Sequence, residues 1–341
     1  MPFTIAIIGD FWREQDAFQR RPFVGPDGQE LTRMLADAGV PEELCFKSTV
    51  FACPVPRNDL ETICVPKSDP EADTNRGAGL VPGKYLRREY TSQVDRLLAE
   101  LDNLRPNVAV LLGNAACWAL LGQTRVSKLR GAVAYSSVLP WLKCLPTYHP
   151  AAVLRQYDLR HVAVMDLTKA KVESAFPEIR RPKREIWIEP TIEDIRLFKA
   201  QFIDGAQRLA FDIETADGQI TCIGFASTID RALVIPFVDP RKTAGNYWPT
   251  LQLEIVAWAL VAEILSGPQE MVAQNGLYDI QYLWMKYGIP VPNSVHDTML
   301  LHHSLLPESE KSLGFLGSVY TNEGSWKEDH ARGKHTIKRE D

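Results

Sequence analysis

Two acidic residues in the second half of the chain have the spacing of a cation site. Asp212 and Glu214 are two apart in "RLAFDIETADGQI" (208–220), where apolar residues alternate with them. On a β-strand, residues two apart share a face, so the two carboxylates repel each other across one pleat. A solvated strand face tolerates that repulsion at little cost, whereas a site for divalent cations requires it.

A third carboxylate follows in "AQNGLYDIQYL" (273–283). Asn275 and Asp279 are four apart, so on a helix they share a face. A helix packed over the first strand brings Asp279 to Asp212 and Glu214. Oxygen ligands suit Mg²⁺ or Mn²⁺, and two such ions can activate water and stabilise the leaving oxygen of a phosphodiester. The alternative is that the pair is an ordinary polar face and Asp279 a cap. "FDIET" followed by N-x-x-x-D favours the metal site.

The elements around these carboxylates suggest a mixed α/β domain of the ribonuclease-H kind. "RLAFDIET", "ITCIGFAS" and "ALVIPFV" are separated by short polar turns, which is typical of an antiparallel meander. Thr191 and Asp194 form a plausible capping pair before a first helix. A helix "EIVAWALVAEIL", a strand "EMVAQN" and a helix "YDIQYLWMKYG" follow the meander, and another helix starts near Asp297.

"FDIET", "AQNGLYDIQYLWMKYGI" and "HDTMLLHHSLLP" resemble the 3′–5′ proofreading exonuclease domain of family-A DNA polymerases, in the DnaQ-like superfamily. "KSLGFLGSVYTNEGSWKED" resembles the phage branch, and the resemblance covers about residues 186–341. It implies hydrolysis of single-stranded DNA from the 3′ end by metal-activated water, with a two-metal Mg²⁺ or Mn²⁺ site. It implies that Asn275 lines the catalytic site and that Asp297 supports it. The implied metal ligands are Asp212, Glu214 and Asp279.

The expected fourth carboxylate of this family is missing from its motif. The family carries a Y-x-x-x-D motif, but the tyrosines after Asp279 are followed four residues on by other types: Tyr282 by Lys286, Tyr287 by Val291 and Tyr320 by Gly324. Asp329 and Asp341 are candidates by residue type only. Losing one ligand weakens a two-metal site. We therefore expect a C-terminally incomplete exonuclease domain that is truncated, split from a downstream polymerase, or catalytically impaired.

The first segment alternates strands and helices. "FTIAIIGD" and "NVAVLLG" are continuous apolar runs, as in buried parallel strands, and "YTSQVDRLLAELDNL" is amphipathic. This order predicts a parallel α/β sheet with ligands at the carboxyl ends of its strands. The basic stretch "EIRRPKREIWIEPT" then suits a linker. We predict domains at 1–178 and 186–341, joined by a linker at 179–185.

Two loops of the first segment carry a possible base pocket. In "IIGDFWREQDAFQRRPFVG", Phe23 beneath the strand-end carboxylate Asp10 can cradle a planar ring. In "PTYHPAAVLR", His149 is held by Pro150, with Arg155 near; a neutral histidine there can donate to a base carbonyl or stabilise a departing anion. The alternatives are a core phenylalanine, a loop-capping aspartate and a satisfied loop histidine.

"RRPFVG", "NVAVLLGNAACWALLG", "SKLRG" and "PTYHPAAVLR" resemble, in order, the family-4 uracil-DNA glycosylases, which implies a three-layer fold. The resemblance implies that Phe23 stacks on the base and that His149 lines its pocket, while Asp10 stands where the family has Glu. Thr49 stands where the family has its base-reading Asn. Its single hydroxyl can satisfy only one partner of uracil at a time, so we expect poor discrimination. Trp12 could fill or wedge the pocket.

The cysteines, the apolar runs and the net charge limit the possible cofactors, partners and cellular compartment. Only Cys53 matches the four-cysteine iron–sulfur site of the glycosylases, so we expect no cluster. The cysteines are scattered and no apolar run reaches about 18 residues, which predicts reduced thiols in a cytosol-like compartment and no membrane span. The resemblance to the phage branch implies a phage-encoded protein in the bacterial cytoplasm. The net charge is −5, so DNA contacts must come from clustered basic residues. The candidates are Arg21 and Arg155, with Arg20, Arg180, Arg181, Lys183 and Arg184.

These features together predict a DNA replication or repair protein that joins a glycosylase-like domain to an exonuclease-like domain. A separately encoded or downstream DNA polymerase is the expected protein partner. Two rival hypotheses remain open. One is a uracil-DNA glycosylase whose exonuclease half is only a scaffold, and the other is a non-catalytic module that binds DNA or a polymerase.

Overall fold

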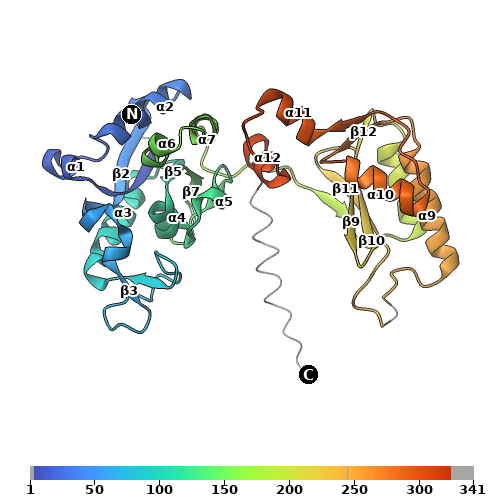
Figure 1. Cartoon of the computed structure of the whole chain (residues 1–341), viewed down its shortest axis with the longest axis horizontal. Helices are drawn as coiled ribbons and strands as arrows, with labels where there is room; N and C mark the ends of the chain where they lie inside the picture. The colour runs from blue at the N-terminus through green and yellow to red at the C-terminus, as the bar shows by residue number, and fades with distance from the viewer. Residues whose placement is uncertain (1–3, 244, 324–341) are drawn as a thin grey trace. The chain divides into compact units, whose positions relative to one another are not determined.

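The computed structural model describes residues 4–243 and 245–323, which form two compact units (Figure 1). The first unit comprises residues 4–180 together with 314–323, and the second comprises 181–313. None of the helices in these described ranges is long and apolar enough to cross a bilayer.

A five-stranded sheet lies at the centre of the first unit. β1 pairs with β2 and β5, and β5 pairs with β7, all in parallel; the short β6 is antiparallel. The strand order is β2 (Cys45–Pro54), β1 (Ile5–Trp12), β5 (Val108–Leu112), β7 (Lys143–Thr147) and β6 (Ala134–Tyr135). A small second sheet pairs β3 (Cys64–Pro66) with β4 (Lys84–Leu86).

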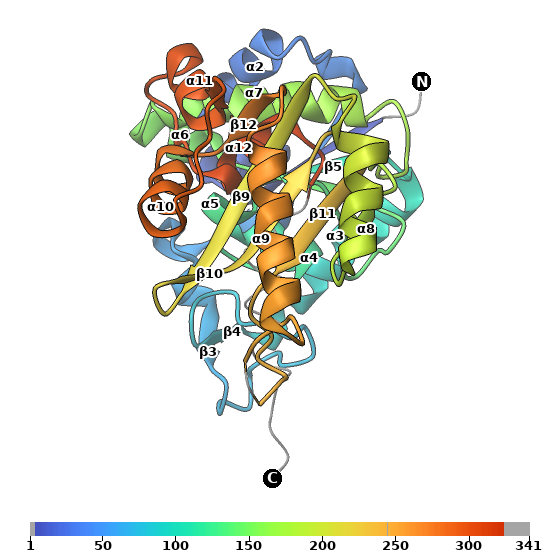
Figure 2. The same ribbon diagram turned by 90° about the vertical axis from the view of Figure 1, so that its right-hand side faces the viewer.

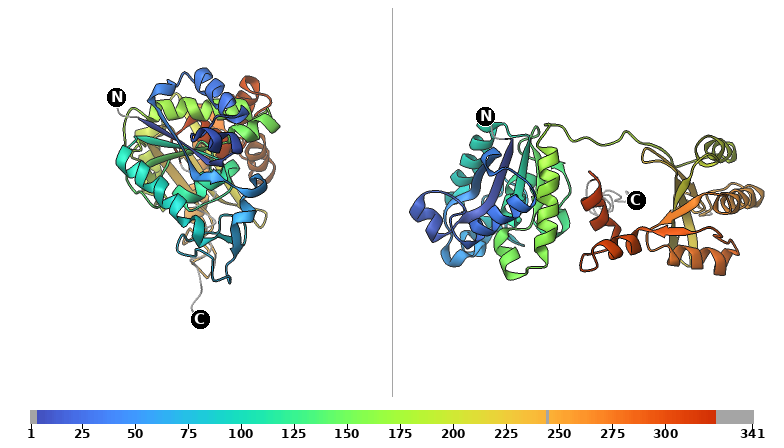
Figure 3. Two further views of the ribbon diagram at one scale, coloured as in Figure 1. Left: turned by 90° about the vertical axis from the view of Figure 1, so that its left-hand side faces the viewer. Right: turned by 90° about the horizontal axis from the view of Figure 1, so that it is seen from above.

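Helices cover both faces of this sheet (Figures 1 and 3). Successive residues of β1 enter opposite cores: Ala6 and Ile8 pack with α3 and α4, while Ile5 and Ile7 pack with α2 and α7. Such alternating burial explains the continuous apolar run and confirms the predicted three-layer fold. The helices are α1 (Glu14–Gln19), α2 (Pro26–Asp37), α3 (Thr91–Leu104), α4 (Asn114–Leu121), α5 (Val126–Leu129), α6 (Pro150–Arg155) and α7 (Leu159–Glu173).

The second unit is built on a six-stranded mixed sheet. β10 is antiparallel to both β9 and β11, which confirms the predicted meander, whereas β12 is parallel to β9 and to β13. Numbered along the chain from β9, the strands lie in the order 3-2-1-4-5, the ribonuclease-H-like arrangement, with β8 added beside β11. The strands are β8 (Glu185–Trp187), β9 (Arg208–Ala216), β10 (Gln219–Ala226), β11 (Arg231–Pro236), β12 (Glu270–Ala273) and β13 (Val295–Asp297).

Four α-helices lie among the described residues of the second unit, and a π-helical turn (Lys199–Ile203) continues the first of them. Figure 2 shows α8 and α9 lying over one face of the sheet formed by β9, β10 and β11. The predicted capping pair is present at α8, where the Thr191 hydroxyl accepts from the backbone N–H of Asp194 and the Asp194 carboxylate accepts from that of Thr191. The helices are α8 (Ile192–Phe198), α9 (Leu251–Leu265), α10 (Leu277–Tyr287) and α11 (Thr298–Leu305).

The last described helix, α12 (Leu313–Tyr320), departs from the predicted domain division. We expected residues 186–341 to form one domain, but the described residues from Gly314 onward group with the first unit. Arg130 donates to the Ser318 hydroxyl at 2.8 Å, and Lys169 donates to the Ser318 carbonyl at 3.0 Å. Arg130 and Lys169 of the first unit therefore hold α12. The short apolar pattern of this helix did not predict these hydrogen bonds.

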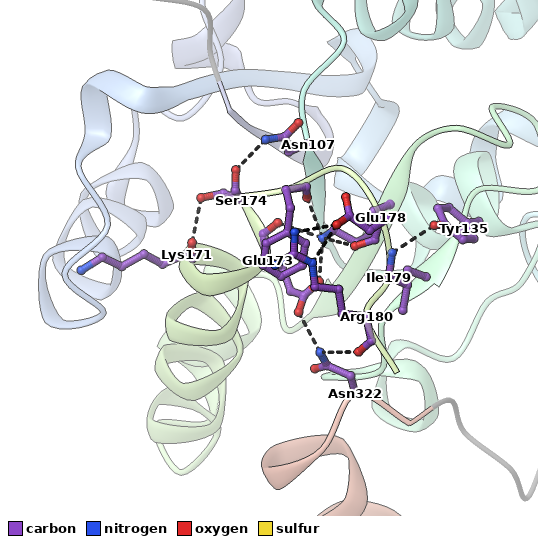
Figure 4. Close-up of polar contacts among 11 residues, drawn as sticks. Asn107, Tyr135, Lys171, Glu173, Ser174, Glu178, Ile179, Arg180 and Asn322 are labelled. Atoms are coloured by element: carbon purple, nitrogen blue, oxygen red, sulfur yellow. Dashed lines mark hydrogen bonds and ion pairs between the residues drawn. The ribbon is translucent and has the colours of Figure 1, made fainter. Parts of the chain in front are cut away.

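The outgoing and returning segments of the chain meet at one buried carboxylate, Glu173, in the first unit (Figure 4). The fully buried Lys143 ammonium donates to Glu173 Oε2 at 2.6 Å and to the carbonyls of Phe176 and Glu178 at 2.9 and 3.1 Å. Asn322 donates to Glu173 Oε1 at 2.9 Å. One ion pair thus orders the chain both where it leaves the first unit and where it returns.

Candidate functional site

The two strand carboxylates of the second unit lie on one face of β9, as the alternation predicted. Asp212 and Glu214 are exposed, while Ile213 between them is buried. The residue that pairs with Asp212 on β10 is Gly224, which has no side chain to cover the carboxylate. The face around Asp212 is therefore open to a ligand.

Asp279 reaches this strand from α10. Its side chain is buried, and Oδ1 accepts the backbone N–H of Ile213 at 3.0 Å. The ladder between β9 and β12 runs only as far as Ala210 and Val272, so beyond it a side chain must satisfy the N–H groups on that edge. The hydrogen bond fixes Asp279 beside the residue that separates Asp212 from Glu214.

The electrostatics of the three carboxylates favour a cation. Although Asp212 is exposed at the surface, desolvation by the protein atoms around its carboxylate, reinforced by the charges of Asp279 and Glu214, raises its pKa to about 6. Burial also raises the pKa of Asp279, against the hydrogen bond from Ile213. Repelling carboxylates with oxygen donors alone suit Mg²⁺ or Mn²⁺. However, within residues 4–243 and 245–323 no three acidic, histidine or cysteine side chains are arranged to hold a metal ion. The two-metal site therefore stays a prediction.

The predicted partnership of Asn275 with Asp279 on one helical face is wrong. Asn275 precedes α10, which starts at Leu277, and its backbone is left-handed with φ of 56°. The helical four-residue spacing therefore does not apply to the pair. The side chain of Asn275 is exposed, and its role at the site stays a prediction.

Asp297 explains the turn before α10. Its Oδ1 accepts the N–H of Asn275 at 3.1 Å and that of Met299 at 2.9 Å, and its Oδ2 accepts the N–H of Gly276 at 2.9 Å. The same side chain caps α11. Both carboxylate oxygens are thus engaged by backbone groups, as expected of a supporting residue rather than a ligand.

Sequence reasoning missed one residue beside the carboxylates, Tyr278. Its hydroxyl lies 3.0 Å from the Thr215 hydroxyl, which places it next to the Glu214 end of β9. Its half-exposed ring is paired with that of Tyr282, with centroids 5.8 Å apart. Exposed aromatic rings stack on bases of single-stranded nucleic acid. The four-residue spacing of the two tyrosines, next to a predicted ligand, was the available signal.

In the first unit, Asp10 lies at the carboxyl end of β1 and is fixed by α4. Its Oδ1 accepts the backbone N–H groups of Ala115 and Ala116 at 2.9 and 3.3 Å. Gly113 has φ of 98°, and a Cβ there would come within 2.8 Å of Asp10 Oδ2. Burial raises the pKa of Asp10 against the opposing charge of His149.

The imidazole of His149 is held in a defined orientation at the start of α6. Its Nδ1 accepts the N–H of Ala151 at 3.1 Å, so the neutral ring carries its proton on Nε2. Burial lowers the pKa of His149, although Asp10 and Asp27 act in the opposite direction. The ring is therefore oriented to donate one N–H in its neutral form, and its predicted role toward a base stays a prediction.

Phe23 and Thr49 both lie against Gly9 on β1. A Cβ on Gly9 would be 2.7 Å from Phe23 Cζ and 3.4 Å from the Thr49 methyl group. The ring of Phe23 lies 6.3 Å from that of His149, centroid to centroid. The Thr49 hydroxyl donates to the Phe51 carbonyl at 3.1 Å, so its only hydrogen is already in use.

A cavity of about 320 Å³ opens beside Asp10 and His149. Asn58 and Arg155 also line it, whereas Phe23 and Thr49 are not among its lining residues. The predicted position of Arg155 beside the pocket is consistent with this lining. The guanidinium of Arg21, the other predicted DNA contact, is exposed and donates to Gln19 at 3.0 and 3.2 Å.

Residues 4–176 match the model of the uracil DNA glycosylase superfamily. The match spans half of the chain, so the chain belongs to this superfamily, as the motifs of the first segment predicted. The chain is 29% identical over 174 residues to the type-4 uracil-DNA glycosylase of Thermotoga maritima, covering 49% of the chain and 76% of that enzyme. It is 30% identical over 173 residues to that of Archaeoglobus fulgidus, covering 48% and 74%.

The similarity to a third relative extends into the second unit. The chain is 22% identical over 319 residues to the DNA polymerase of Bacillus phage SP01, covering 83% of the chain but only 30% of the polymerase. Among solved structures, the EXO domain of Aedes aegypti Nibbler aligns at 14% identity with a TM-score of 0.32, covering 43% of the chain and 73% of that domain. A score this low does not define a fold, so the class of the second unit rests on its strand order.

Proposed function

We propose that this chain is a DNA replication and repair protein whose second unit hydrolyses single-stranded DNA from the 3′ end with Mg²⁺ or Mn²⁺. The observation that carries this proposal is the hydrogen bond from Ile213 to Asp279, which joins Asp279 to the strand of Asp212 and Glu214. The similarity to a phage DNA polymerase over most of the chain supports a replicative setting.

The chemistry follows from the three carboxylates. Cations between Asp212, Glu214 and Asp279 would acidify water and offset the charge that develops on the phosphodiester. Ile213 holds Asp279 in place, and Tyr278 offers an exposed ring for a terminal base. Asp212 must lose its proton to ligate a cation, and its pKa without a cation is about 6, so cation binding should weaken as the pH falls below that value. Asp329 and Asp341, the candidates for a fourth ligand by type, lie outside the described residues.

The test uses a 5′-labelled single strand incubated with Mg²⁺ or Mn²⁺. The parent chain should produce a ladder that shortens from the 3′ end, and Asp212→Asn should slow it at least about 100-fold, as for loss of an essential group. Asp217→Asn is the matched control, because Asp217 is an exposed carboxylate in the β9–β10 turn. Equal digestion by the parent and Asp212→Asn would show that the site is wrongly assigned.

A second candidate function, uracil recognition, is favoured by the superfamily match and by the neutral His149 N–H beside the cavity. Because the Thr49 hydroxyl is occupied, we propose binding with slow or no excision. Release of uracil from a labelled oligonucleotide at the rate of a working glycosylase would favour the rival in which the second unit is a scaffold. DNA binding without any turnover, even in Mn²⁺, would favour the non-catalytic module that binds DNA or a polymerase.

A further inference from the structure

The outer edge of β8 in the second unit is open. β8 is the last strand of the six-stranded sheet, and no strand among the described residues pairs with its outer side. The N–H of Glu185 donates to the carbonyl of Asp230, just before β11, at 2.8 Å. Because alternate residues of a strand direct their backbone groups to opposite edges, those of Ile186 point outward. An edge strand of this kind is a template for pairing with a further strand.

Two isoleucines on this edge are exposed. Ile186 is 52% exposed, and Ile188, the first residue after β8, is 62% exposed. Residues two apart in an extended chain share a face, so the two side chains form one apolar strip. Trp187 between them lies on the other face, where its ring is 5.3 Å from that of Phe198, centroid to centroid. Natural edge strands are usually protected by charged side chains or proline, and this strip has neither.

The strip lies in a segment that reads the same in both directions, Glu-Ile-Trp-Ile-Glu at residues 185–189. When two copies pair antiparallel about Trp187, Ile186 of each copy lies opposite Ile188 of the other. Both residues direct their backbone groups outward, so each pair exchanges two hydrogen bonds. The four isoleucines meet on one face of the joined sheet, and the contact is the same from either copy, as an isologous interface requires.

The charges around this segment favour antiparallel pairing. Basic residues precede the segment and acidic residues follow it. They are Arg181, Lys183 and Arg184 on the first side and Glu193 and Asp194 on the second. In an antiparallel contact the basic start of one copy faces the acidic end of the other, at both ends of the contact. A parallel contact would instead place like charges side by side, which is unfavourable.

The register about Trp187 adds one further contact and one repulsion. It places Arg184 of the second copy opposite Pro190, beside a pocket of about 260 Å³ that Glu189 and Asp194 line. It also places Glu185 opposite Glu189 of the second copy. Both glutamates are already compensated, because Glu185 lies 3.5 Å from the Arg231 guanidinium and Glu189 lies 2.7 Å from that of Arg241.

We propose that the outer edge of β8 is the interface of a homodimer, in which two copies of this chain pair antiparallel through residues 185–189. The two six-stranded sheets then form one continuous sheet. β10 and β11 separate β8 from β9, so the contact does not cover the face of Asp212 and Glu214. A standard stable interface uses about 20–30 residues a side. This contact is smaller, so we expect a reversible dimer with a Kd on the order of 10 μM.

Sedimentation velocity of the full chain between about 1 and about 100 μM tests the dimer, since this range brackets the expected Kd. The mass of the parent should rise from that of one chain toward that of two. Ile186→Lys places a charge in the apolar strip and should raise the Kd at least about tenfold. Ile255→Lys is the matched control, because Ile255 is an isoleucine of α9 that is 58% exposed, and it should dimerise like the parent.

Three results would overturn the proposal. The parent could remain monomeric throughout the concentration range, or it could dimerise only when a single-stranded oligonucleotide is added. Ile186→Lys could also dimerise as well as Ile255→Lys does, which would place the interface elsewhere on the chain.

A disulfide test checks the register. Facing residues of a hydrogen-bonded antiparallel pair have Cα atoms about 5.5 Å apart, within the range of a disulfide, whereas diagonal residues are about 7–8 Å apart. Oxidation of a mixture of the Ile186→Cys and Ile188→Cys chains should therefore give several-fold more covalent dimer than either variant alone. The parent, which keeps its own six cysteines, measures the background. Equal yields from the mixture and from the single variants would overturn the antiparallel pairing about Trp187.

Discussion

Asp212 destabilises the folded second unit whenever it is ionised and no cation is near. Its pKa is raised from 3.8 to about 6, first by burial and then by the charges of Asp279 and Glu214. At pH values between 3.8 and about 6, the Asp212 carboxyl is more often protonated in the folded state than in the unfolded state. The free energy of unfolding therefore falls as the pH rises through this window, and the full penalty is present above pH 6.

Asp212→Asn should consequently stabilise the metal-free second unit at pH 8. One pKa unit corresponds to about 1.4 kcal/mol, but solvent screens an exposed carboxylate, so we expect a gain of only about 1 kcal/mol. For a folded unit of roughly 150 residues, such a gain raises the melting temperature by about 2–4 °C. Thermal unfolding in EDTA should show the gain at pH 8 and its disappearance near pH 4. A variant less stable than the parent at pH 8 would contradict the repulsion.

Single residues mark where sequence reasoning reached its limit. Alternation in β9 correctly predicted which side Asp212 and Glu214 occupy, because burial in a strand follows a local period of two. The position of Asn275 was not predictable in this way, since Asp297, 22 residues later, holds its backbone in the left-handed region. Asn58 likewise drew no attention, because only the folded chain places it among the residues that line the cavity beside His149.

At the scale of elements, strand order was predictable where short turns join neighbouring strands. The β9–β10–β11 meander and the parallel strands of the first unit follow from local apolar patterns. The attachment of α12 was not predictable, because its anchors Arg130 and Lys169 lie far away in the sequence. Side-chain hydrogen bonds over such separations leave no periodic signal in the chain.

The buried pair of Lys143 and Glu173 should be essential for the first unit. Replacing Lys143 by Met leaves the Glu173 carboxylate buried without its cation and the carbonyls of Phe176 and Glu178 without their donor. Breaking a buried ion pair on one side costs about 3–5 kcal/mol. Asn322→Ala removes one hydrogen bond to the same carboxylate and should cost only about 1 kcal/mol. Thermal unfolding of the full chain measures both losses.

Limited proteolysis should show where the loss of Lys143 loosens the chain. Thermolysin should cut the parent slowly within residues 174–180, and Lys143→Met should accelerate cleavage there, because that segment loses its common donor. Lys242→Met is the matched control, since Lys242 is an exposed lysine that donates to a backbone carbonyl in the second unit. Equal cleavage of parent and Lys143→Met would mean that the ion pair does not hold this segment.

At the scale of the whole molecule, the chain carries two independent cores. Apolar residues of the first unit gather on the two faces of its parallel sheet, and those of the second unit form a separate cluster. Because α12 belongs to the first unit, the second unit is inserted into the chain between two parts of the first. Domains with their own cores usually unfold as separate cooperative units. We therefore expect two unfolding transitions in calorimetry.

Divalent cations should shift only one of these transitions. At the proposed site, Mg²⁺ or Mn²⁺ would relieve the repulsion among Asp212, Glu214 and Asp279 in the folded second unit, whereas the unfolded chain keeps these carboxylates apart. A ligand at about 100 times its Kd stabilises the folded state by about 2.7 kcal/mol. A titration with either cation should raise the transition of the second unit and leave that of the first unchanged. In the double variant Asp212→Asn, Asp279→Asn the shift should disappear, because the repulsion that makes cation binding favourable is gone. An equal shift in the double variant would place cation binding elsewhere in the chain and would remove the physical basis of the nuclease proposal.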